Sequence, residues 1–215
     1  MIYPARYRDK SGEETTSISN DGEVLRMDLR GVGFVGRMLD DWEPVEPIAP
    51  DIAARFTFDF DQLSDYALRF AIPVPVMQGD QTLQGLLDVH LELGRVVNGR
   101  FDHERLGITL KTGDRTYAAR QNQGWFDDAL CELRDLLPIG VFIKCCHSCA
   151  YSDYSPAGYG VFGGLACFRN CKQEYLALKG KRAFFSLVNR MDRYVQETYL
   201  CAEFEKRAPG TGYRG

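Results

Sequence analysis

The sequence predicts an α+β fold in which an N-terminal antiparallel β meander precedes a helical C-terminal part. Three observations lead to this prediction. Apolar and polar residues alternate through residues 1–120, helical spacing first appears at Phe126, and five of the seven cysteines lie between Cys145 and Cys171. Period-2 alternation is typical of half-buried strands, whereas clustered thiols indicate a metal site. We expect a β-sheet region at 1–120 and a helical zinc-binding region at 121–215, as two units or one continuous domain.

The first strands are expected at residues 3–8, 13–19 and 23–29. Asp9–Gly12 and Asn20–Gly22 separate them, and both segments have the composition of hairpin turns. An acidic segment with three prolines follows at residues 40–50. Its composition predicts a linker or an exposed arm.

Alternation resumes after this segment and predicts four more strands. Residues 68–76 place apolar side chains on one face, with Pro73 and Pro75 on the other. Because proline cannot donate a ladder hydrogen bond, this strand is expected at a sheet edge. Residues 87–93, 106–110 and 116–119 complete a meander with one buried and one solvated face.

Three helices are expected after the meander. The first, residues 126–137, has an apolar stripe at spacings of four, three and four, with Asp127 and Asp128 in its first turn. Acidic residues are favourable there because they complement the helix dipole. Similar apolar spacing predicts a second helix over residues 168–178 and a third over residues 182–199.

Composition and charge exclude several classes of protein. A hydrophobic content of 45% with 26% charged residues is typical of globular proteins. No apolar run approaches the roughly 20 residues that cross a bilayer, and residues 1–7 lack the apolar core of a secretory signal. We therefore expect a cytoplasmic protein with no membrane partner. In a reducing compartment, an odd number of thiols argues against a disulfide framework.

The clustered thiols predict a treble-clef-like four-cysteine zinc site. Cys146 and Cys149 have the spacing of a zinc knuckle, and Cys167 is expected at the start of the second helix, where the helix dipole favours a thiolate. Cys201 is preferred as the fourth ligand over Cys171, which lies on an apolar stripe, but the choice between them stays open. Four thiolates would hold a structural Zn²⁺ with no open coordination position.

Three nearby residues receive other interpretations. Cys145 is expected to face the core, and Cys131 lies at the edge of the apolar face of its helix and is interpreted as a bystander. His147 lies inside the knuckle, where it could replace one thiol, but an exposed loop histidine is the favoured interpretation.

Other segments resemble chemical motifs without their context. Residues 31–36 match G-x-G-x-x-G, but the following residues are too few before Pro44 for a dinucleotide-binding helix. Asp88, His90 and Glu92 share the polar face of one strand, and Ser152 and Asp153 follow the knuckle. For both sets the favoured interpretation is structural: a solvated sheet face in the first case and turn hydrogen bonding in the second.

Four C-terminal motifs resemble those of an uncharacterised bacterial domain-of-unknown-function family. They are YSDYSP at residues 151–156, CFRN at 167–170, QETYLC at 196–201 and GTGYRG at 210–215. The resemblance implies a bacterial source and no particular activity. It also implies that Cys146, Cys149, Cys167 and Cys201 are the thiols carried by the motifs.

The sequence favours a zinc-stabilised factor of accessory or immunity type that binds another protein and has no evident catalytic set. One alternative is an enzyme that uses the Ser152–Asp153 loop or the face formed by Asp88, His90 and Glu92. A second is nucleic-acid binding by the basic C-terminal part, since residues 167–215 carry ten Lys or Arg against five Asp or Glu. The basic residues in question are Lys179, Lys181, Arg182, Arg190 and Arg193. The overall net charge of −4 makes this alternative the weaker one.

Overall fold

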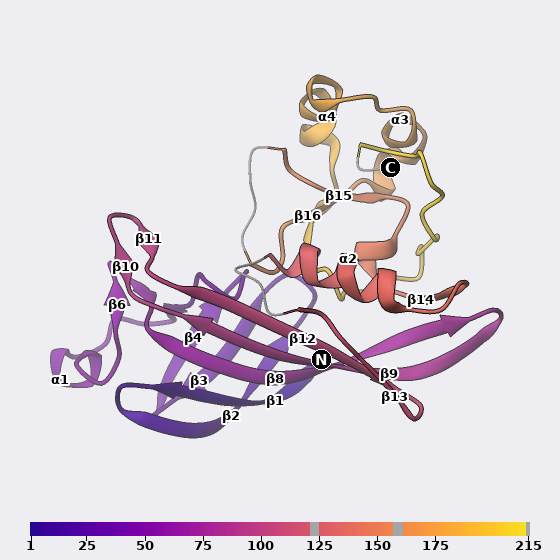
Figure 1. Ribbon diagram of the computed structural model, residues 1–215. Helices are drawn as coiled ribbons and strands as arrows, with labels where there is room; N and C mark the ends of the chain where they lie inside the picture. Colours follow the sequence, from indigo (N-terminus) through magenta and orange to yellow (C-terminus); the bar gives the residue numbers. More distant parts are fainter. Residues whose placement is uncertain (121–124, 157–160, 214–215) are drawn as a thin grey trace.

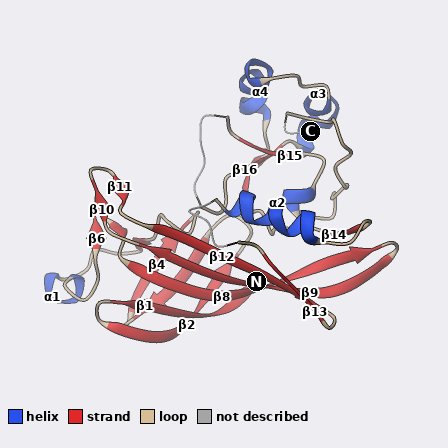
Figure 2. Cartoon of the chain, viewed as in Figure 1, coloured by secondary structure: helices blue, strands red, loops and turns tan. Residues whose placement is uncertain are grey.

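The computed structural model describes residues 1–120, 125–156 and 161–213, and most of its regular structure is antiparallel strand (Figures 1 and 2). A ten-stranded sheet dominates the molecule. Its strands are β1 (Ile2–Asp9), β2 (Gly12–Asn20), β3 (Leu25–Leu29), β4 (Val32–Gly36), β5 (Glu43–Pro44), β8 (Tyr66–Gln78), β9 (Gln81–Leu93), β12 (Glu104–Thr112), β13 (Arg115–Ala118) and β14 (Val141–Ile143). The spatial order is β13-β12-β9-β8-β1-β2-β3-β4-β5, and β14 pairs with the end of β8.

The remaining elements are short. Two small hairpins are formed by β6 (Phe58–Asp59) with β7 (Gln62–Leu63), and by β10 (Val96–Val97) with β11 (Arg100–Phe101). A three-stranded sheet consists of β15 (Ser152–Tyr154), β16 (Leu165–Cys167) and β17 (Arg193–Val195). The helices are α1 (Pro50–Ala53), α2 (Phe126–Leu136), α3 (Lys172–Leu176) and α4 (Lys181–Leu187), with 3-10 turns at Cys146–Ser148, Arg169–Cys171 and Val188–Arg190.

Period-2 alternation correctly predicts the long strands of the main sheet. Leu87, Val89 and Leu91 on β9 are fully buried, and they lie opposite apolar residues of β8 and β12. Burial of each large apolar side chain contributes about 1.5–3 kcal/mol, so this face drives the folding of the meander. Helix α2 packs against β12 and β13, with Phe126 and Leu133 buried in the same core.

The expected edge position of the strand with two prolines is wrong. Strand β8 lies between β9 and β1, but β1 pairs only with residues 67–70 and β14 only with residues 76–78. Pro73 and Pro75 fall in the gap between these two partners. No strand of the sheet needs a hydrogen bond from the nitrogen of either proline, so their lack of an N–H group costs nothing here. The Pro75 carbonyl accepts a hydrogen bond from the Lys144 N–H at 2.8 Å.

The acidic segment at residues 40–50 is not a linker. Trp42 is fully buried in the main core, and the next two residues form β5 at the end of the sheet. The Asp41 carboxylate accepts hydrogen bonds from the backbone N–H groups of Arg37 and Met38. Burial of an indole and these local bonds hold the segment against β4, despite its linker-like composition.

The α+β class with a helical C-terminal part is also wrong, because the chain is mostly antiparallel β and uses strands after residue 140 as well. The expected helix over residues 168–178 is a 3-10 turn followed by the short α3. The expected helix over 182–199 ends at Leu187, and residues 193–195 form β17 instead. Pairing of β17 with β16 outweighs the helical spacing of the apolar residues, since long-range contacts routinely override local propensity.

The treble-clef-like four-cysteine zinc site is wrong for a related reason. Cys167 lies on strand β16 opposite Ser152, not at the start of a helix. Among the described residues, no three of Cys146, Cys149, Cys167 and Cys201 have all their sulfur atoms within 4.8 Å of one another.

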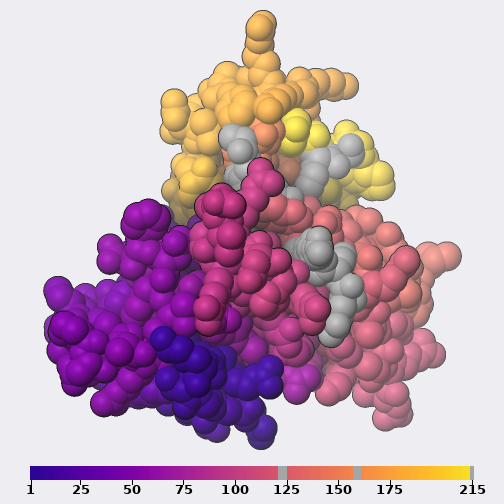
Figure 3. Space-filling view, turned by 60° about the vertical axis from the view of Figure 1, so that its left-hand side comes forward, coloured from indigo at the N-terminus to yellow at the C-terminus, as the bar shows by residue number. Residues whose placement is uncertain are grey.

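The C-terminal elements lie over the face of the main sheet that carries α2 (Figures 1 and 3). Two hydrogen bonds join the C-terminal part to the N-terminal part: the Val161 N–H donates to the Asp40 carboxylate at 3.2 Å, and the Gln196 N–H donates to the Gly22 carbonyl at 3.4 Å. The boundary expected at residue 121 falls in 121–124, outside the described residues. Among the helices that the structure describes, none has the length and apolar character to span a bilayer.

Candidate metal centre

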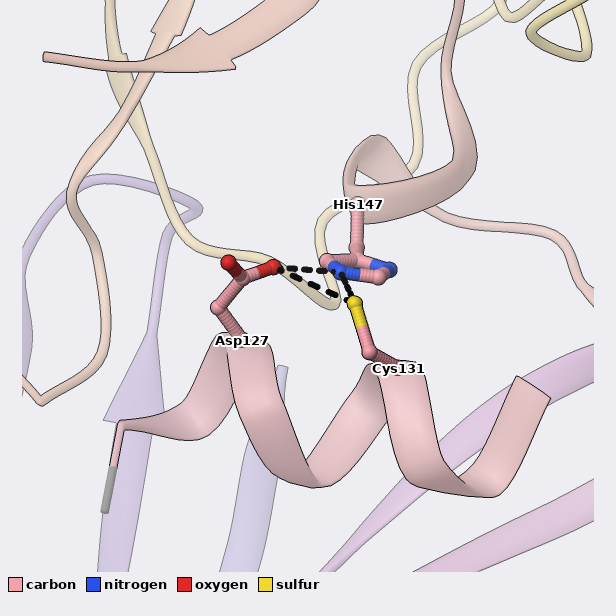
Figure 4. Close-up of side chains that lie close together, drawn as sticks. All are labelled: Asp127, Cys131 and His147. Carbon is pink, nitrogen blue, oxygen red and sulfur yellow. Dashed lines mark hydrogen bonds and ion pairs between the residues drawn. The ribbon is translucent and has the colours of Figure 1, made fainter. Parts of the chain in front are cut away.

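Three side chains of types that commonly bind metal ions, Asp127, Cys131 and His147, converge between α2 and the 3-10 turn at Cys146–Ser148 (Figure 4). His147 Nε2 lies 2.8 Å from Asp127 Oδ1 and 3.8 Å from Cys131 Sγ. Asp127 Oδ1 and Cys131 Sγ are also 3.8 Å apart. The side chains of His147 and Asp127 are 10% and 15% exposed. One carboxylate, one thiol and one imidazole therefore meet at a single sheltered point.

Helix α2 presents two of these ligands. Asp127 and Cys131 are four residues apart, and such residues lie one above the other on the same face of a helix. The apolar stripe of α2 includes Phe126 and Leu133, which are buried in the main core. Burial of this stripe fixes the rotation of α2 and places Asp127 and Cys131 along its flank, where both are partly buried. Asp127 also lies in the first turn, where the helix dipole favours its negative charge.

Hydrogen bonds from the C-terminal segment hold His147 over this face. The His147 N–H donates to the Glu197 carbonyl at 2.9 Å, and the Cys146 N–H donates to the Tyr199 carbonyl at 2.7 Å. Ser148 Oγ donates to the Ile143 carbonyl at 2.6 Å and ties the turn back to β14. The 3-10 turn is thereby held by β14 on one side and by the segment that follows β17 on the other, and this positions the imidazole over α2.

The three contacts do not have the geometry of a Cys–His–Asp catalytic triad. A triad needs the carboxylate on one ring nitrogen and the nucleophile on the other, so that the base is held while it accepts a proton. Here Asp127 and Cys131 both lie nearest to Nε2 of His147. Convergence on one point is instead the arrangement of ligands around a metal ion. In a tetrahedral zinc site with bonds of about 2.0–2.3 Å, ligand atoms lie about 3.3–3.8 Å apart. The two separations of 3.8 Å from Cys131 Sγ match this range, whereas the 2.8 Å between His147 Nε2 and Asp127 Oδ1 is a hydrogen-bond distance that would lengthen by about 0.5 Å around an ion.

A second carboxyl group, that of Glu197, lies near this point. Glu197 is buried, with its carboxylate accepting hydrogen bonds from Tyr154 Oη at 2.9 Å and from the Gly163 N–H at 2.8 Å. Burial raises the pKa of Glu197 to about 7, and the charge of the neighbouring Asp127 adds to this shift. Two carboxyl groups and a thiol gathered out of solvent form an environment that a bound cation would stabilise.

A cavity of about 620 Å³ opens beside the three ligands. All three ligand residues line it, together with residues of α2, β14 and the segment around Lys206. This volume is within the range of about 300–1,000 Å³ that is common for small-molecule sites. An ion held by three protein ligands would therefore face a space that admits a further ligand.

The four thiols expected to bind zinc do not belong to this group of three side chains. Cys146, Cys149 and Cys167 are buried and Cys201 is partly buried. Burial raises the pKa of the Cys146 thiol, and the negative charge of the other three thiols adds to the shift. The thiols are thus near enough to influence one another electrostatically but do not converge as the three ligands at α2 do. Cys171 packs in the second apolar cluster with Phe168 and Tyr175, as its stripe predicts.

The side chains of the two enzyme alternatives are engaged in structural contacts. Ser152 Oγ donates to the Cys146 carbonyl, and Asp153 Oδ2 accepts a hydrogen bond from Tyr175 Oη at 2.8 Å. On β9, Asp88 pairs with a lysine, and His90 Nε2 lies 3.3 Å from a Glu92 carboxylate oxygen. Burial lowers the pKa of His90. The contacts on β9 fit the solvated sheet face that was the favoured interpretation, whereas Ser152 and Asp153 are buried on strand β15 and do not lie in a turn.

Sequence reasoning missed the three converging residues. It assigned Asp127 to the helix dipole, Cys131 to a bystander position and His147 to an exposed loop, and the exposed-loop assignment is wrong. The sequence signal that could have found the site is a carboxylate and a thiol at positions i and i+4 of one helix, with a histidine 16 residues after the cysteine. That spacing becomes informative only when the turn carrying His147 is known to lie over α2.

Comparison with protein families supports the expected resemblance. A model of a family of unknown function, DUF6304, matches residues 1–152. The chain belongs to this family. The matched stretch contains the main sheet, α2 and the turn with His147. The motifs that suggested such a family lie at and beyond the end of the matched stretch. No curated protein and no solved structure matches the chain.

Proposed function

We propose that the protein binds one divalent transition-metal ion, preferentially Zn²⁺, through Asp127, Cys131 and His147, and acts on a small molecule in the adjoining cavity. The observation that carries this proposal is the convergence of three different ligand atoms, 2.8–3.8 Å apart, on the wall of that cavity. Thiolate, imidazole and carboxylate are the three protein ligand types of zinc, and thiolate disfavours the harder Mg²⁺ and Ca²⁺.

The number of ligands supports a reactive site over a structural one. Structural zinc sites are closed by four protein ligands, whereas catalytic sites have three and leave one position for water or substrate. A zinc ion with such an open position would lower the pKa of a water bound to it to about 7, or would polarise the carbonyl oxygen of a substrate. A metal-dependent enzyme of the hydrolytic or hydration type is therefore the activity that this arrangement supports best.

Metal content is the direct test. Protein purified without added metal and then incubated with one equivalent of Zn²⁺ should retain about one ion per chain after desalting, as measured by native mass spectrometry. In His147→Ala and Asp127→Asn, zinc affinity should fall at least about 100-fold, because removal of one of three ligands leaves too few donors. Asp127→Asn preserves shape and hydrogen bonding, so it separates loss of a ligand from loss of fold.

His103→Ala is the matched control. His103 also lies beside a carboxylate, that of Asp102, but its side chain is 49% exposed and it does not belong to α2 or to the turn with His147. This variant should bind zinc like the unmodified protein. Unchanged zinc affinity in both His147→Ala and Asp127→Asn would refute the assignment of ligands. So would a wild-type protein that retains no zinc.

The protein-binding role and the nucleic-acid alternative stay predictions from sequence. In the basic part, Arg190 pairs with Glu174 at 2.8 Å and Arg193 donates to Tyr199 Oη at 3.0 Å. The structural support lies with the converging ligands and their cavity, so we propose neither role here.

A further inference from the structure

The cavity beside the three ligands has two chemically distinct surfaces. Most of its wall is apolar, and besides Asp127 and His147 the charged residues that line it are the cationic Lys206, Arg207 and Arg134. The apolar wall is formed by Leu130, Leu137, Val141, Phe142, Ile143 and Pro209. A molecule that fills the cavity would therefore need an apolar body and a group that tolerates positive charge.

The three cationic side chains differ in how many hydrogen-bond or ion-pair partners they already have within the protein. Arg134 Nε lies 2.9 Å from the Asp135 carboxylate. Arg207 donates to the Tyr175 hydroxyl and to the Thr211 carbonyl, both internal acceptors. Lys206 Nζ lies 4.2 Å from the centre of the Phe142 ring, and among the described residues it forms no ion pair within 4.0 Å. Lys206 is therefore the cation in the wall with the most charge left for a ligand.

A bound divalent ion would make the charge of the cavity clearly positive. Its two charges would offset the Asp127 carboxylate and the Cys131 thiolate, which are the anionic groups among its ligands. Arg134 keeps its partner Asp135 and Arg207 keeps its internal acceptors, so Lys206 would be the cation left without an anionic partner at a largely apolar wall. Such a space favours an anion, because the ammonium group of Lys206 and the bound ion would both attract negative charge.

We infer that the cavity binds a small organic carboxylate with an apolar body, whose carboxylate lies between the metal position and Lys206. The aliphatic or aromatic body would pack against Phe142, Leu137 and Val141. This inference rests on the proposed metal site. Carboxylate oxygen is a good ligand for zinc, and the ammonium group of Lys206 would supply a second, charge-assisted contact.

Octanoate is a suitable probe, with octanol and octylammonium as matched molecules of the same length. Co²⁺ would replace Zn²⁺, because its visible spectrum reports changes in coordination. In protein that contains one Co²⁺ per chain, octanoate should change this spectrum and bind at least about tenfold more tightly than octanol or octylammonium, as measured by calorimetry. Chelator-treated protein should bind octanoate at least tenfold more weakly.

Lys206→Met tests the second contact, since methionine preserves the apolar stem and removes the charge. It should weaken octanoate binding about tenfold while the Co²⁺ content stays at one per chain. Lys206→Arg should restore most of the affinity. Lys179→Met, at an exposed lysine outside the cavity lining, should leave octanoate binding unchanged.

The two proposals fail in distinguishable ways. A full complement of Co²⁺ with no octanoate binding, or with equal binding of octanol, would overturn the carboxylate inference alone. Unchanged octanoate affinity in Lys206→Met would do the same. If the wild-type protein retains no metal, the proposed function and this inference fall together.

Discussion

Phe126→Ala is expected to lower the free energy of unfolding by about 3–5 kcal/mol, which is the usual cost of removing a buried aromatic side chain. Phe126 is 1% exposed, and its ring centre lies 4.7 Å from that of Phe162. It anchors the first turn of α2 to both the main core and the C-terminal part. Chemical denaturation of the metal-free protein, followed by circular dichroism, measures the change.

The same substitution should weaken zinc binding about tenfold or more, because Asp127 and Cys131 depend on the rotation of α2. Leu136→Ala is the control: Leu136 lies at the end of the same helix but is 52% exposed, so its loss should change stability by no more than about 0.5 kcal/mol. A Phe126→Ala protein that is destabilised by less than about 1 kcal/mol would contradict the role of Phe126 as an anchor.

Arg207→Met is expected to have the second large effect, a loss of about 2–4 kcal/mol in the free energy of unfolding. The guanidinium group donates to the Ser152 carbonyl, to Tyr175 Oη at 3.1 Å and to the Thr211 carbonyl at 3.0 Å. Ser152 and Tyr175 are buried, so the substitution would leave their oxygen atoms with fewer donors. Each unsatisfied buried group costs about 1–3 kcal/mol.

Thermal unfolding should show a clear fall in midpoint for Arg207→Met. The neighbouring Lys206→Met, which removes an equal charge from an exposed side chain, should leave the midpoint nearly unchanged. Equal midpoints for Arg207→Met and Lys206→Met would show that the hydrogen bonds of Arg207 contribute little to holding the C-terminal segment against β15.

Strands of the main sheet were predictable because burial on one face imposes a local pattern. Leu87, Val89 and Leu91 alternate with polar residues, and one buried face is enough to produce this spacing. Helix α2 was equally evident from its stripe. Strand β17 was not, because the spacing of Val188, Met191 and Val195 also suits a helix and only pairing with β16 decides between the two.

The candidate site could not be predicted, because its ligands come from two elements whose contact depends on long-range packing. The clustered cysteines predicted a metal site at Cys146 and Cys149, but the histidine between them, His147, lies beside Asp127 and Cys131 of α2. The position of His147 depends on hydrogen bonds to the backbone of Glu197 and on the rotation of α2 against the sheet. Neither can be read from local spacing.

X-ray absorption at the zinc edge of the protein with one Zn²⁺ bound tests the central claim most directly. A site formed by Asp127, Cys131 and His147 predicts one sulfur neighbour at about 2.3 Å and nitrogen or oxygen neighbours at about 2.0–2.2 Å. A first shell of four sulfur atoms would contradict this assignment and place the ion among the other thiols.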